Sequence, residues 1–566
     1  MNKPSHPHGA VTCELKSASA IGAQILLDGG SAADAIIATT LAVGTVASYH
    51  SGIGGGGFAI VRQPDGGYRS IDFRSAAPAA LTSAMFIGKP EATGIGGLSV
   101  AVPGELRGFE ELHRRYGRLP WKRLFQPSIE LARDGFPFTE DLMRLIRTNT
   151  LPKATSDLSH SWILKHPILR EMYTKDGSFL PIGSILTRPK LAHALELIAE
   201  NGADVFYNGQ LAKDLIDSVA AEGGVMTLDD LKNYRVRETQ PLSIDYKGKY
   251  KITSPSAPAS GGVFLLALNV LSNYTGIGGP DTVEDSHMMI ESLKFAYAQR
   301  TLLGDPNFVH DLEAAQDEWT KSEVGRDLYS RILHDSTLPS ELCCSILFYL
   351  GARSDNTVKP DHGTSNIVAV DSGGLVISIT TTITLWWGSR IVVPSSEIVL
   401  NDSIEDFSVE GKHYYVCLLL CQSNHFGYLP TPANYVEGNK RPLSSSSPFI
   451  IEDSEGRFRY AGGAAGGSRI ISCNVQQARN FMDYGMDPLQ ALSYHRLHDQ
   501  IAPNETHLEE GLVNGEVAAA LEKMGHKIKW LPRAGSVGCA ISYDPEIDLY
   551  QAEGEPRLAE SGGQVI

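Results

Sequence analysis

The chain has 566 residues, 42% of them hydrophobic and 20% charged, so it can bury a sizeable core and is neither disordered nor fibrous. Acidic residues outnumber basic ones, 65 to 49, giving a formal net charge of −16. Nucleic acids and anionic membranes are bound by basic surfaces, so this balance argues against both as partners. Seven scattered cysteines without a CxxC pair argue against a disulfide scaffold and a zinc ribbon.

The N-terminal segment offers no targeting signal. Residues 1–20 contain no apolar core of a secretory signal peptide. The least charged stretch, residues 35–61, is interrupted by a glycine run, and a membrane span needs about 20 predominantly apolar residues. We therefore expect a protein without a membrane span, located in the cytoplasm.

The first 120 residues alternate between helical and strand patterns. Residues 17–27 have helical periodicity and stop at DGG, after which Ser31 and Asp34 form a capping-box pattern that opens a buried helix to about residue 46. Residues 58–63 and 68–75, joined by PDGG, predict a hairpin. A strand over 98–102 and a helix over 105–116 follow.

The rest of the chain reads first as helical and then as strand-rich. Residues 120–240 are mainly helical in pattern, 246–253 predict a strand and 262–271 a helix. Strands are expected at 365–371 and 375–385, a hairpin at 448–452 and 457–461, and a helix over 468–485. Thr380, Thr382 and Thr384 alternate along one strand and so share one of its faces. This mixture predicts a layered α/β or α+β protein.

Two apolar, cysteine-containing stretches stand where polar loops are expected. They are ELCCSILFYLG at 341–351 and KHYYVCLLLCQ at 412–422. We hypothesise that they are unusual insertions or products of a misassigned splice site, which sequencing of the mature transcript would decide.

The glycine run at 52–57 formally matches GxGxxG. The dinucleotide-binding fingerprint requires a strand before the glycines and a helix after them. Here a helix precedes and a strand follows, so we interpret the run as a tight connection at which backbones approach closely.

The segment DHGTSN at 361–366 has the features of an internal self-cleaving site. A threonine hydroxyl at the head of a strand can attack its own preceding carbonyl, and Gly363 has no side chain to block that approach. Cleavage would free an α-amine beside the same hydroxyl, and with a pKa near 8 such an amine can act as the base for the nucleophile. The alternative is an ordinary strand that begins with threonine.

Three further groups offer contacts to an acyl substrate, and each has a structural alternative. GGAAGG at 462–467 precedes a helix, so its N–H groups can form an oxyanion hole or simply a flexible turn. Hydroxyls at 444–447 can donate to a carboxylate or line a polar loop. Arg74 ends an apolar strand and requires an anion, which a substrate or a structural ion pair would supply.

Together these segments resemble the γ-glutamyltranspeptidases, members of the N-terminal-nucleophile hydrolase class. The resemblance covers almost the whole chain and is carried by ordered matches. They are DGGSAADA at 28–35, SGIGGGGF at 51–58, IDFRSAAP at 71–78, GGLSVAVPGELRGFEELHRRYGRLPW at 96–121, LFQPSIELARDGFP at 124–137, FAYAQRTLLGDP at 295–306, HGTSN at 362–366, TTTI at 380–383, RPLSS at 441–445 and GGAAGGS at 462–468.

The resemblance implies an α+β fold, a four-layer αββα sandwich of two stacked antiparallel sheets between helical layers. It also implies a precursor that cuts itself between Gly363 and Thr364. The products would be a large subunit, residues 1–363, and a small subunit, residues 364–566, intertwined in one αββα unit.

Roles for individual residues follow from the same resemblance. Thr364 matches the nucleophile, Thr382 the threonine that hydrogen-bonds the nucleophile's amine, and Gly466 with Gly467 the oxyanion hole. The remaining matches concern the γ-glutamyl group. Its α-carboxylate would be bound by Arg74, Ser444 and Ser445, and its α-ammonium by Asp406 with the residues at positions 384 and 403.

The implied reaction is ping-pong acyl transfer. Thr364 takes the γ-glutamyl group from glutathione or a glutathione conjugate, and the ester passes to water or to the amine of an amino acid or peptide. The resemblance implies no metal and no organic cofactor. The implied partners are the donor, the acceptor and the two subunits of the precursor.

Three departures from the family pattern concern the donor pocket. The family usually has Asn where this chain has Thr384, and Glu or Gln where it has Ser403. The third is the stretch 412–422, which lies in the lid segment. Two alternatives therefore stay open, an amidase or acylase of the same fold with another acyl donor, and a pseudoenzyme that does not process itself.

Overall fold

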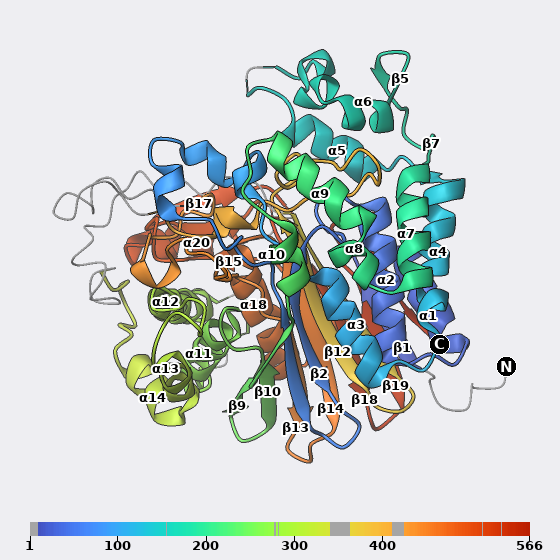
Figure 1. Cartoon of the computed structure of the whole chain (residues 1–566). Helices are drawn as coiled ribbons and strands as arrows, with labels where there is room; N and C mark the ends of the chain where they lie inside the picture. Colours follow the sequence, from blue (N-terminus) through green and yellow to red (C-terminus); the bar gives the residue numbers. More distant parts are fainter. Residues whose placement is uncertain are drawn as a thin grey trace.

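The computed structural model describes residues 9–153, 155–276, 279–280, 282–339, 363–409, 424–511, 513–533 and 535–566. Two large sheets lie face to face between two layers of helices (Figure 1). The predicted αββα sandwich is thereby confirmed. The stretches 341–351 and 412–422, for which we hypothesised insertion or missplicing, lie outside the described residues.

The first sheet has seven strands in the order β20-β1-β11-β12-β2-β3-β8, all paired antiparallel. Their bounds are Gly562–Val565 for β20, Gly9–Cys13 for β1, Gly363–Asp371 for β11, Val376–Thr384 for β12, Gly56–Arg62 for β2, Tyr68–Phe73 for β3 and Arg237–Thr239 for β8. Strands from before residue 363 (β1, β2, β3 and β8) and from residue 363 onward (β11, β12 and β20) pair with one another in this sheet, so neither part of the chain forms it alone.

The second sheet has six strands in the order β19-β18-β14-β13-β10-β9, also antiparallel. Their bounds are Leu549–Glu553 for β19, Val537–Asp544 for β18, Phe458–Ala465 for β14, Phe449–Asp453 for β13, Tyr250–Ser254 for β10 and Leu242–Tyr246 for β9. Between the sheets lies a small apolar cluster that includes Ile60, Val368, Val370, Ile450 and Ile541.

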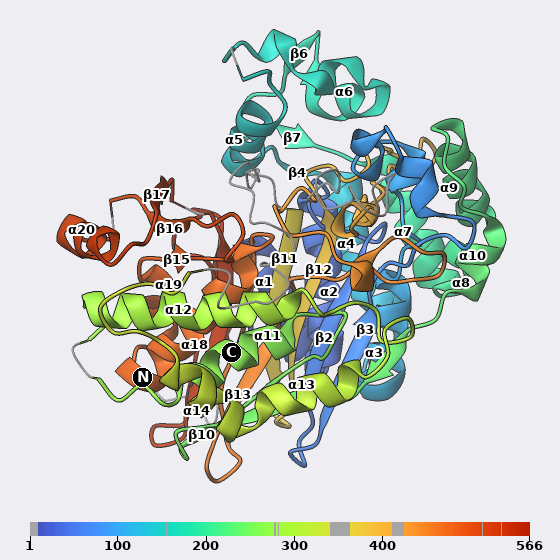
Figure 2. The ribbon, with the colours of Figure 1, turned by 90° about the vertical axis from the view of Figure 1, so that its left-hand side faces the viewer.

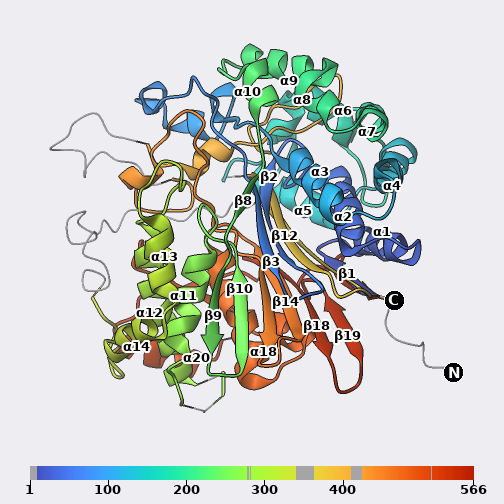
Figure 3. The ribbon, with the colours of Figure 1, turned by 60° about the horizontal axis from the view of Figure 1, so that its bottom comes forward.

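Helices cover the outer face of each sheet (Figure 3). On the first sheet lie α1 (Lys16–Leu27), α2 (Ala32–Val46), α3 (Glu105–Tyr116), α4 (Trp121–Asp134), α7 (Pro189–Asn201), α8 (Asp204–Asn208), α9 (Gln210–Ala221) and α10 (Leu228–Asn233). On the second lie α11 (Gly261–Leu271), α12 (Val283–Arg300), α13 (Leu312–Thr320), α14 (Ser322–Ser330), α18 (Arg469–Tyr484), α19 (Pro488–Ser493) and α20 (Gly515–Lys523).

Smaller elements extend from this core (Figure 2). They are α5 (Glu140–Asn149), α6 (Pro167–Tyr173), the pair β4 (Phe136–Pro137) and β7 (Ile185–Leu186), the pair β5 (Thr174–Lys175) and β6 (Ser178–Phe179), and a three-stranded sheet of β15 (Leu497–His498), β16 (Thr506–Glu509) and β17 (Ile528–Leu531). None of the helices in the described ranges is both long and apolar enough to cross a bilayer.

Most predicted elements are present. The capping box of Ser31 and Asp34 opens α2, and the predicted helix over 105–116 is α3. The strand expected over 98–102 is wrong: residues 97–99 form a short 3-10 helix, and only Val102 bridges to Ala76. The single strand expected over 246–253 is instead the end of β9, a turn and β10, because Lys247 and Gly248 both adopt positive φ.

The glycine run at 52–57 allows two backbone segments to approach closely, as its position in the sequence predicted. A Cβ at Gly55 would lie 2.2 Å from the carbonyl oxygen of Thr382, and one at Gly57 would lie 2.0 Å from that of Thr380. Both obstacles are backbone atoms of β12, which cannot move independently of the sheet. The glycines therefore allow β2 and its approach segment to pack directly against the threonine-rich strand.

Gly55→Ala should lower the free energy of unfolding by about 1–3 kcal/mol, because the added methyl group forces β12 to shift. Gly515→Ala is the matched control, since no atom lies within 4 Å of a Cβ at that helical position. Chemical denaturation of both variants measures the difference. Equal stability of the two variants would contradict the close-packing interpretation.

Candidate active site

Thr364, at the start of β11, and Thr382, near the end of β12, face each other across two adjacent antiparallel strands. Thr364 pairs with Thr382 in the β11–β12 ladder, and the register shifts between Gly363 and Thr364. The Thr364 hydroxyl donates to Oγ1 of Thr382 at 3.1 Å, and the Thr382 hydroxyl donates to the carbonyl oxygen of Gly363. The amide N–H of Thr384 donates to the same Thr382 oxygen at 2.8 Å. Thr382 thus connects the predicted nucleophile to the carbonyl that it would attack.

Gly363 is required for packing as well as for access. A Cβ there would lie 2.8 Å from the carbonyl oxygen of Leu385 and 3.1 Å from Cα of His50. A larger residue would displace the Gly363 carbonyl from the Thr382 hydroxyl. The sequence pattern indicated only that glycine allows access by the nucleophile, and the structure adds this steric constraint.

Arg74 and Asp406, predicted to bind opposite ends of an amino-acid group, form an ion pair with each other. The Arg74 side chain is fully buried, and its Nε donates to the carbonyl oxygen of Pro442 at 3.4 Å. Its Nη1 has no hydrogen-bond partner within the described residues. Burial raises the pKa of Asp406, and the Arg74 charge opposes that shift. The pair holds one positive and one negative group side by side in a largely dry site.

Thr384 and Ser403 lie together, at the end of β12 and the start of a 3-10 turn over Ser403–Asp406. Their hydroxyl oxygens are 2.9 Å apart and hydrogen-bonded. Thr384 has a φ of 83°, a strained conformation for a β-branched residue that asparagine adopts more easily. The two departures noted in the sequence therefore form one continuous part of the site.

Ser444 and Ser445 are buried but bond to different neighbours. Ser444 Oγ donates to Ser446 Oγ at 3.0 Å, and Ser445 Oγ lies 2.9 Å from the Tyr428 hydroxyl. Within the described residues no hydrogen bond joins Arg74 to either serine; its contact with this segment is through Pro442. The structure thus places Arg74 and the two serines in adjoining segments without joining them directly.

Arg300 and Tyr428 are contacts that the sequence analysis did not identify. The guanidinium of Arg300 lies 3.6 Å from the ring centroid of Tyr428, and its Nη2 donates to Ser445 Oγ at 3.4 Å. The Arg300 charge also acts to lower the pKa of Asp406. The sequence feature that could have identified Arg300 is its position at the end of the mostly apolar run FAYAQR, residues 295–300. The structure buries the arginine at that position.

Gly466 and Gly467 form the turn between β14 and α18, with φ values of 132° and 57°. β14 packs over β11: a Cβ at Gly463 would lie 2.2 Å from Nδ2 of Asn366. Asn366 is two residues after Thr364, and Gly466 is three residues after Gly463. This places the glycine turn and Thr364 at the same end of the sandwich, as an oxyanion hole requires.

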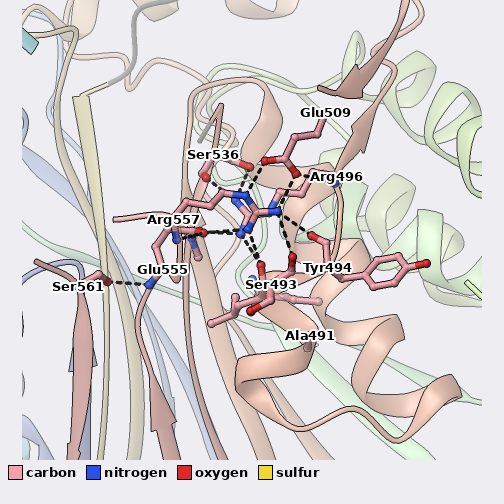
Figure 4. A network of polar contacts seen from close by, with 12 residues as sticks. Ala491, Ser493, Tyr494, Arg496, Glu509, Ser536, Glu555, Arg557 and Ser561 are labelled. Carbon is pink, nitrogen blue, oxygen red and sulfur yellow. Dashed lines mark hydrogen bonds and ion pairs between the residues drawn. The ribbon is translucent and has the colours of Figure 1, made fainter. Parts of the chain in front are cut away.

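Ser536, which contacts that turn, belongs to a network of four charged side chains (Figure 4). A Cβ at Gly466 would lie 2.9 Å from Cα of Ser536, so the two backbones are in contact. Arg496 donates to Ser536 and pairs with Glu555 at 2.6 Å. Arg557 then bridges Glu555 and Glu509 at 3.0 Å and 2.5 Å, which balances two positive with two negative charges.

The four-layer sandwich is that of an N-terminal-nucleophile hydrolase. It is similar to the crystal structure of cephalosporin acylase from Bacillus halodurans, with a TM-score of 0.81, 24% identity and coverage of 100% of this chain and 98% of that one. It is also similar to the γ-glutamyltranspeptidase of Helicobacter pylori, with a TM-score of 0.54, 29% identity and coverage of 60% of this chain and 95% of that one.

The chain belongs to the γ-glutamyltranspeptidase family. The family model described as Gamma-glutamyltranspeptidase matches residues 18–565. The glutathione hydrolase proenzyme of Arthroderma benhamiae is 38% identical over 99% of this chain and 93% of its own length. The glutathione hydrolase proenzyme of Escherichia coli is 32% identical over 97% of this chain and 90% of its own length.

Asp406→Asn should destabilise the fold by about 3–5 kcal/mol, because it leaves the buried Arg74 guanidinium without its carboxylate. Replacing both partners, as Arg74→Met with Asp406→Asn, should cost less than the single change. Urea denaturation of the three proteins measures both effects. The Arg74→Met single variant, measured in the same way, completes the comparison. If the double variant is as unstable as the sum of the two single changes, the two residues are not energetically coupled.

Proposed function

We propose that this protein is a self-cleaving γ-glutamyl acyltransferase that acts on glutathione or its conjugates. The observation that carries the proposal is the chain of hydrogen bonds from the Thr364 hydroxyl through Thr382 to the Gly363 carbonyl. The two curated relatives described above are glutathione hydrolase proenzymes, a name that agrees with both a γ-glutamyl donor and a processed precursor.

Self-cleavage would use the bonds already present. Oγ1 of Thr364 attacks the carbonyl carbon of Gly363, and the Thr382 hydroxyl stabilises the negative charge that develops on the carbonyl oxygen. The Gly363–Thr364 C–N bond breaks, the hydroxyl proton passes to the departing nitrogen, and an ester remains. Water hydrolyses that ester, which frees the Thr364 hydroxyl and its α-amine, and leaves residues 1–363 and 364–566.

Turnover would repeat the attack on the donor. The free α-amine takes the Thr364 hydroxyl proton as Oγ1 attacks the γ-carbonyl carbon of the donor. N–H groups of the Gly466–Gly467 turn stabilise the oxyanion, and the protonated amine gives its proton to the departing amide nitrogen. Water or an amine then attacks the γ-glutamyl ester, which yields glutamate or a new γ-glutamyl amide and restores Thr364.

Recognition of the γ-glutamyl group would use the ion pair of Arg74 and Asp406. A free α-amino acid end carries a carboxylate and an ammonium group, the complement of these two side chains. The donor would exchange the Arg74–Asp406 contact for two new ion pairs, while Ser444, Ser445, Thr384 and Ser403 supply hydroxyls around them. The exchange leaves no buried charge unpaired, which satisfies the main requirement for a charged ligand in a dry pocket.

Thr364→Ala should give a folded, uncut and inactive precursor, because no hydroxyl remains to attack Gly363. Thr364→Ser should process slowly, since it keeps both the hydroxyl and the future amine. A denaturing gel with N-terminal sequencing of any small fragment measures both. A fragment that starts at residue 364 in the alanine variant would disprove the assignment of the nucleophile.

Thr384→Asn with Ser403→Glu should raise kcat/KM for glutathione by roughly tenfold or more. The neutral hydroxyl pair offers the donor's α-ammonium less than a carboxylate and an amide do, and a hydrogen bond to a charged group contributes about 1.5–3 kcal/mol. Thr384→Asn alone should also raise the unfolding midpoint, since asparagine tolerates the positive φ at this position.

The control for this prediction is the extent of self-cleavage, which must match in all proteins compared. An unchanged kcat/KM in a fully cut double variant would show that positions 384 and 403 do not limit donor recognition.

A panel of γ-glutamyl and other acyl anilides on the unmodified enzyme separates γ-glutamyl transfer from a different acylase activity. Preference for a non-glutamyl anilide would favour the acylase alternative.

A further inference from the structure

Ser365 and Thr381 form a second cross-strand pair directly beneath the catalytic threonines. They are opposite each other in the β11–β12 ladder, one residue from Thr364 and Thr382 respectively. Because side chains alternate along a strand, this pair points to the other face of the sheet, toward the helical layer of α1 to α4. That side of the two strands has no role in the proposed mechanism.

Ser365 is held by a buried glutamate from the start of the chain. Its hydroxyl lies 2.6 Å and 2.8 Å from the two carboxyl oxygens of Glu14, which stands between β1 and α1 and is only 7% exposed. Nε2 of His50 lies 3.7 Å from Oε1 of the same carboxyl group. Burial lowers the pKa of His50 to about 3, so this imidazole is neutral at pH 7.

Thr381 is held in the same way by a second glutamate. Its hydroxyl donates to Oε2 of Glu105, the first residue of α3, which is fully buried. Oε1 of Glu105 has no hydrogen-bond partner in the described part of the chain. Two carboxyl groups from the first 363 residues thus bind two hydroxyls of the last 203, next to the two threonines of the proposed site.

Burying the carboxyl groups of Glu14 and Glu105 costs free energy, because each loses hydrogen bonds to water that protein groups must replace. Burial is the largest cause that raises the pKa of Glu14 and of Glu105, each to about 7. A carboxyl oxygen accepts from a hydroxyl in both the protonated and the ionised form. The two contacts therefore persist on either side of neutral pH, and a glutamine at either position can replace them.

We propose that Glu14 and Glu105 are positioning residues that hold the two catalytic strands from the helix side, so that the Thr364 and Thr382 hydroxyls stay in contact. The proposal rests on the proposed function. Its strongest consequence concerns Glu14, because cleavage at Gly363 removes the covalent restraint on Thr364. Ser365 is then the second residue of the small fragment, and Glu14 restrains it through its side chain without touching the reactive groups.

Glu14→Ala and Ser365→Ala should lower kcat for a γ-glutamyl anilide at least tenfold and change KM less than twofold, because a small displacement of an aligned nucleophile is costly. Self-cleavage should be affected less, since the Gly363–Thr364 bond still restrains the nucleophile at that stage. Glu14→Gln should recover most of the loss through its amide oxygen. If Glu14→Ala fails to fold, Ser365→Ala, which removes only a hydroxyl, provides the same test.

The matched control is another buried acid–hydroxyl pair, Asp499 and Thr506, whose oxygens are 2.7 Å apart between β15 and β16. Asp499→Ala should lower the unfolding midpoint without lowering kcat of the cut enzyme. A loss of kcat in Asp499→Ala equal to that in Glu14→Ala would assign both effects to general stability and overturn the proposal. So would an unchanged kcat in Glu14→Ala or Ser365→Ala.

Hydrogen exchange separates this proposal from the proposed function. In the cut protein, the N-terminal peptide of the small fragment should exchange its amide hydrogens faster in Ser365→Ala than in the unmodified protein, while the β18 peptide stays unchanged. If the unmodified protein shows no γ-glutamyl turnover, the proposed function fails, and the exchange result still decides the role of Glu14. Equal exchange of the N-terminal peptide in both proteins would overturn the proposal.

Discussion

The contact between the Thr364 and Thr382 hydroxyls depends on the register of β11 against β12, and much of the architecture serves that register. β12 is central in its sheet, with β11 on one side and β2 on the other. The glycine run lets β2 approach β12 without a side chain between them. A shift of either strand by one residue would turn its own threonine, Thr364 or Thr382, to the helix side and bring the neighbouring Ser365 or Thr381 into its place, so the register determines which hydroxyls face each other.

The charges of the site impose a second constraint. The Arg74 side chain is fully buried. Two residues before it in the chain, Asp72 forms a second buried ion pair, with Arg441 at 2.6 Å. In these two pairs each charge has a partner of opposite sign, so the four groups balance one another before any substrate enters. A ligand with a single charge would leave one member of the Arg74–Asp406 pair uncompensated, whereas a zwitterion replaces both. Under the proposed function, the site would therefore select for the α-amino acid end of a donor by the cost of separating its own ion pair.

Local patterns predicted much of this arrangement and missed specific parts of it. The alternation of Thr380, Thr382 and Thr384 was readable because a strand has a period of two, and the capping box of α2 because its signal is local. The strand expected at 98–102 failed because Gly96 and Gly97 start a tight turn, whose geometry is set by contact with Gly224. The role expected of Asp406 came from the resemblance alone, since nothing in the local sequence distinguishes it from a loop residue.

Glu14 and Glu105 show a more general limit of sequence reasoning. A lone glutamate at the junction of a strand and a helix, or at a helix N-terminus, usually lies in solvent, where it interacts favourably with the helix dipole. Only the packing of α1 and α3 against the first sheet turns these two side chains inward, and that packing depends on contacts hundreds of residues apart in the sequence, such as Glu14 with Ser365.

The same long-range contacts explain how a cut chain would remain one molecule. β1 lies between β20 and β11, and β2 pairs with β12, so three ladders of the first sheet join residues before 363 to residues after it. β10 and β13 add a fourth ladder in the second sheet. Breaking the single bond before Thr364 would remove none of these ladders, so the proposed self-cleavage would free the α-amine of Thr364 while the surrounding sheet keeps its place.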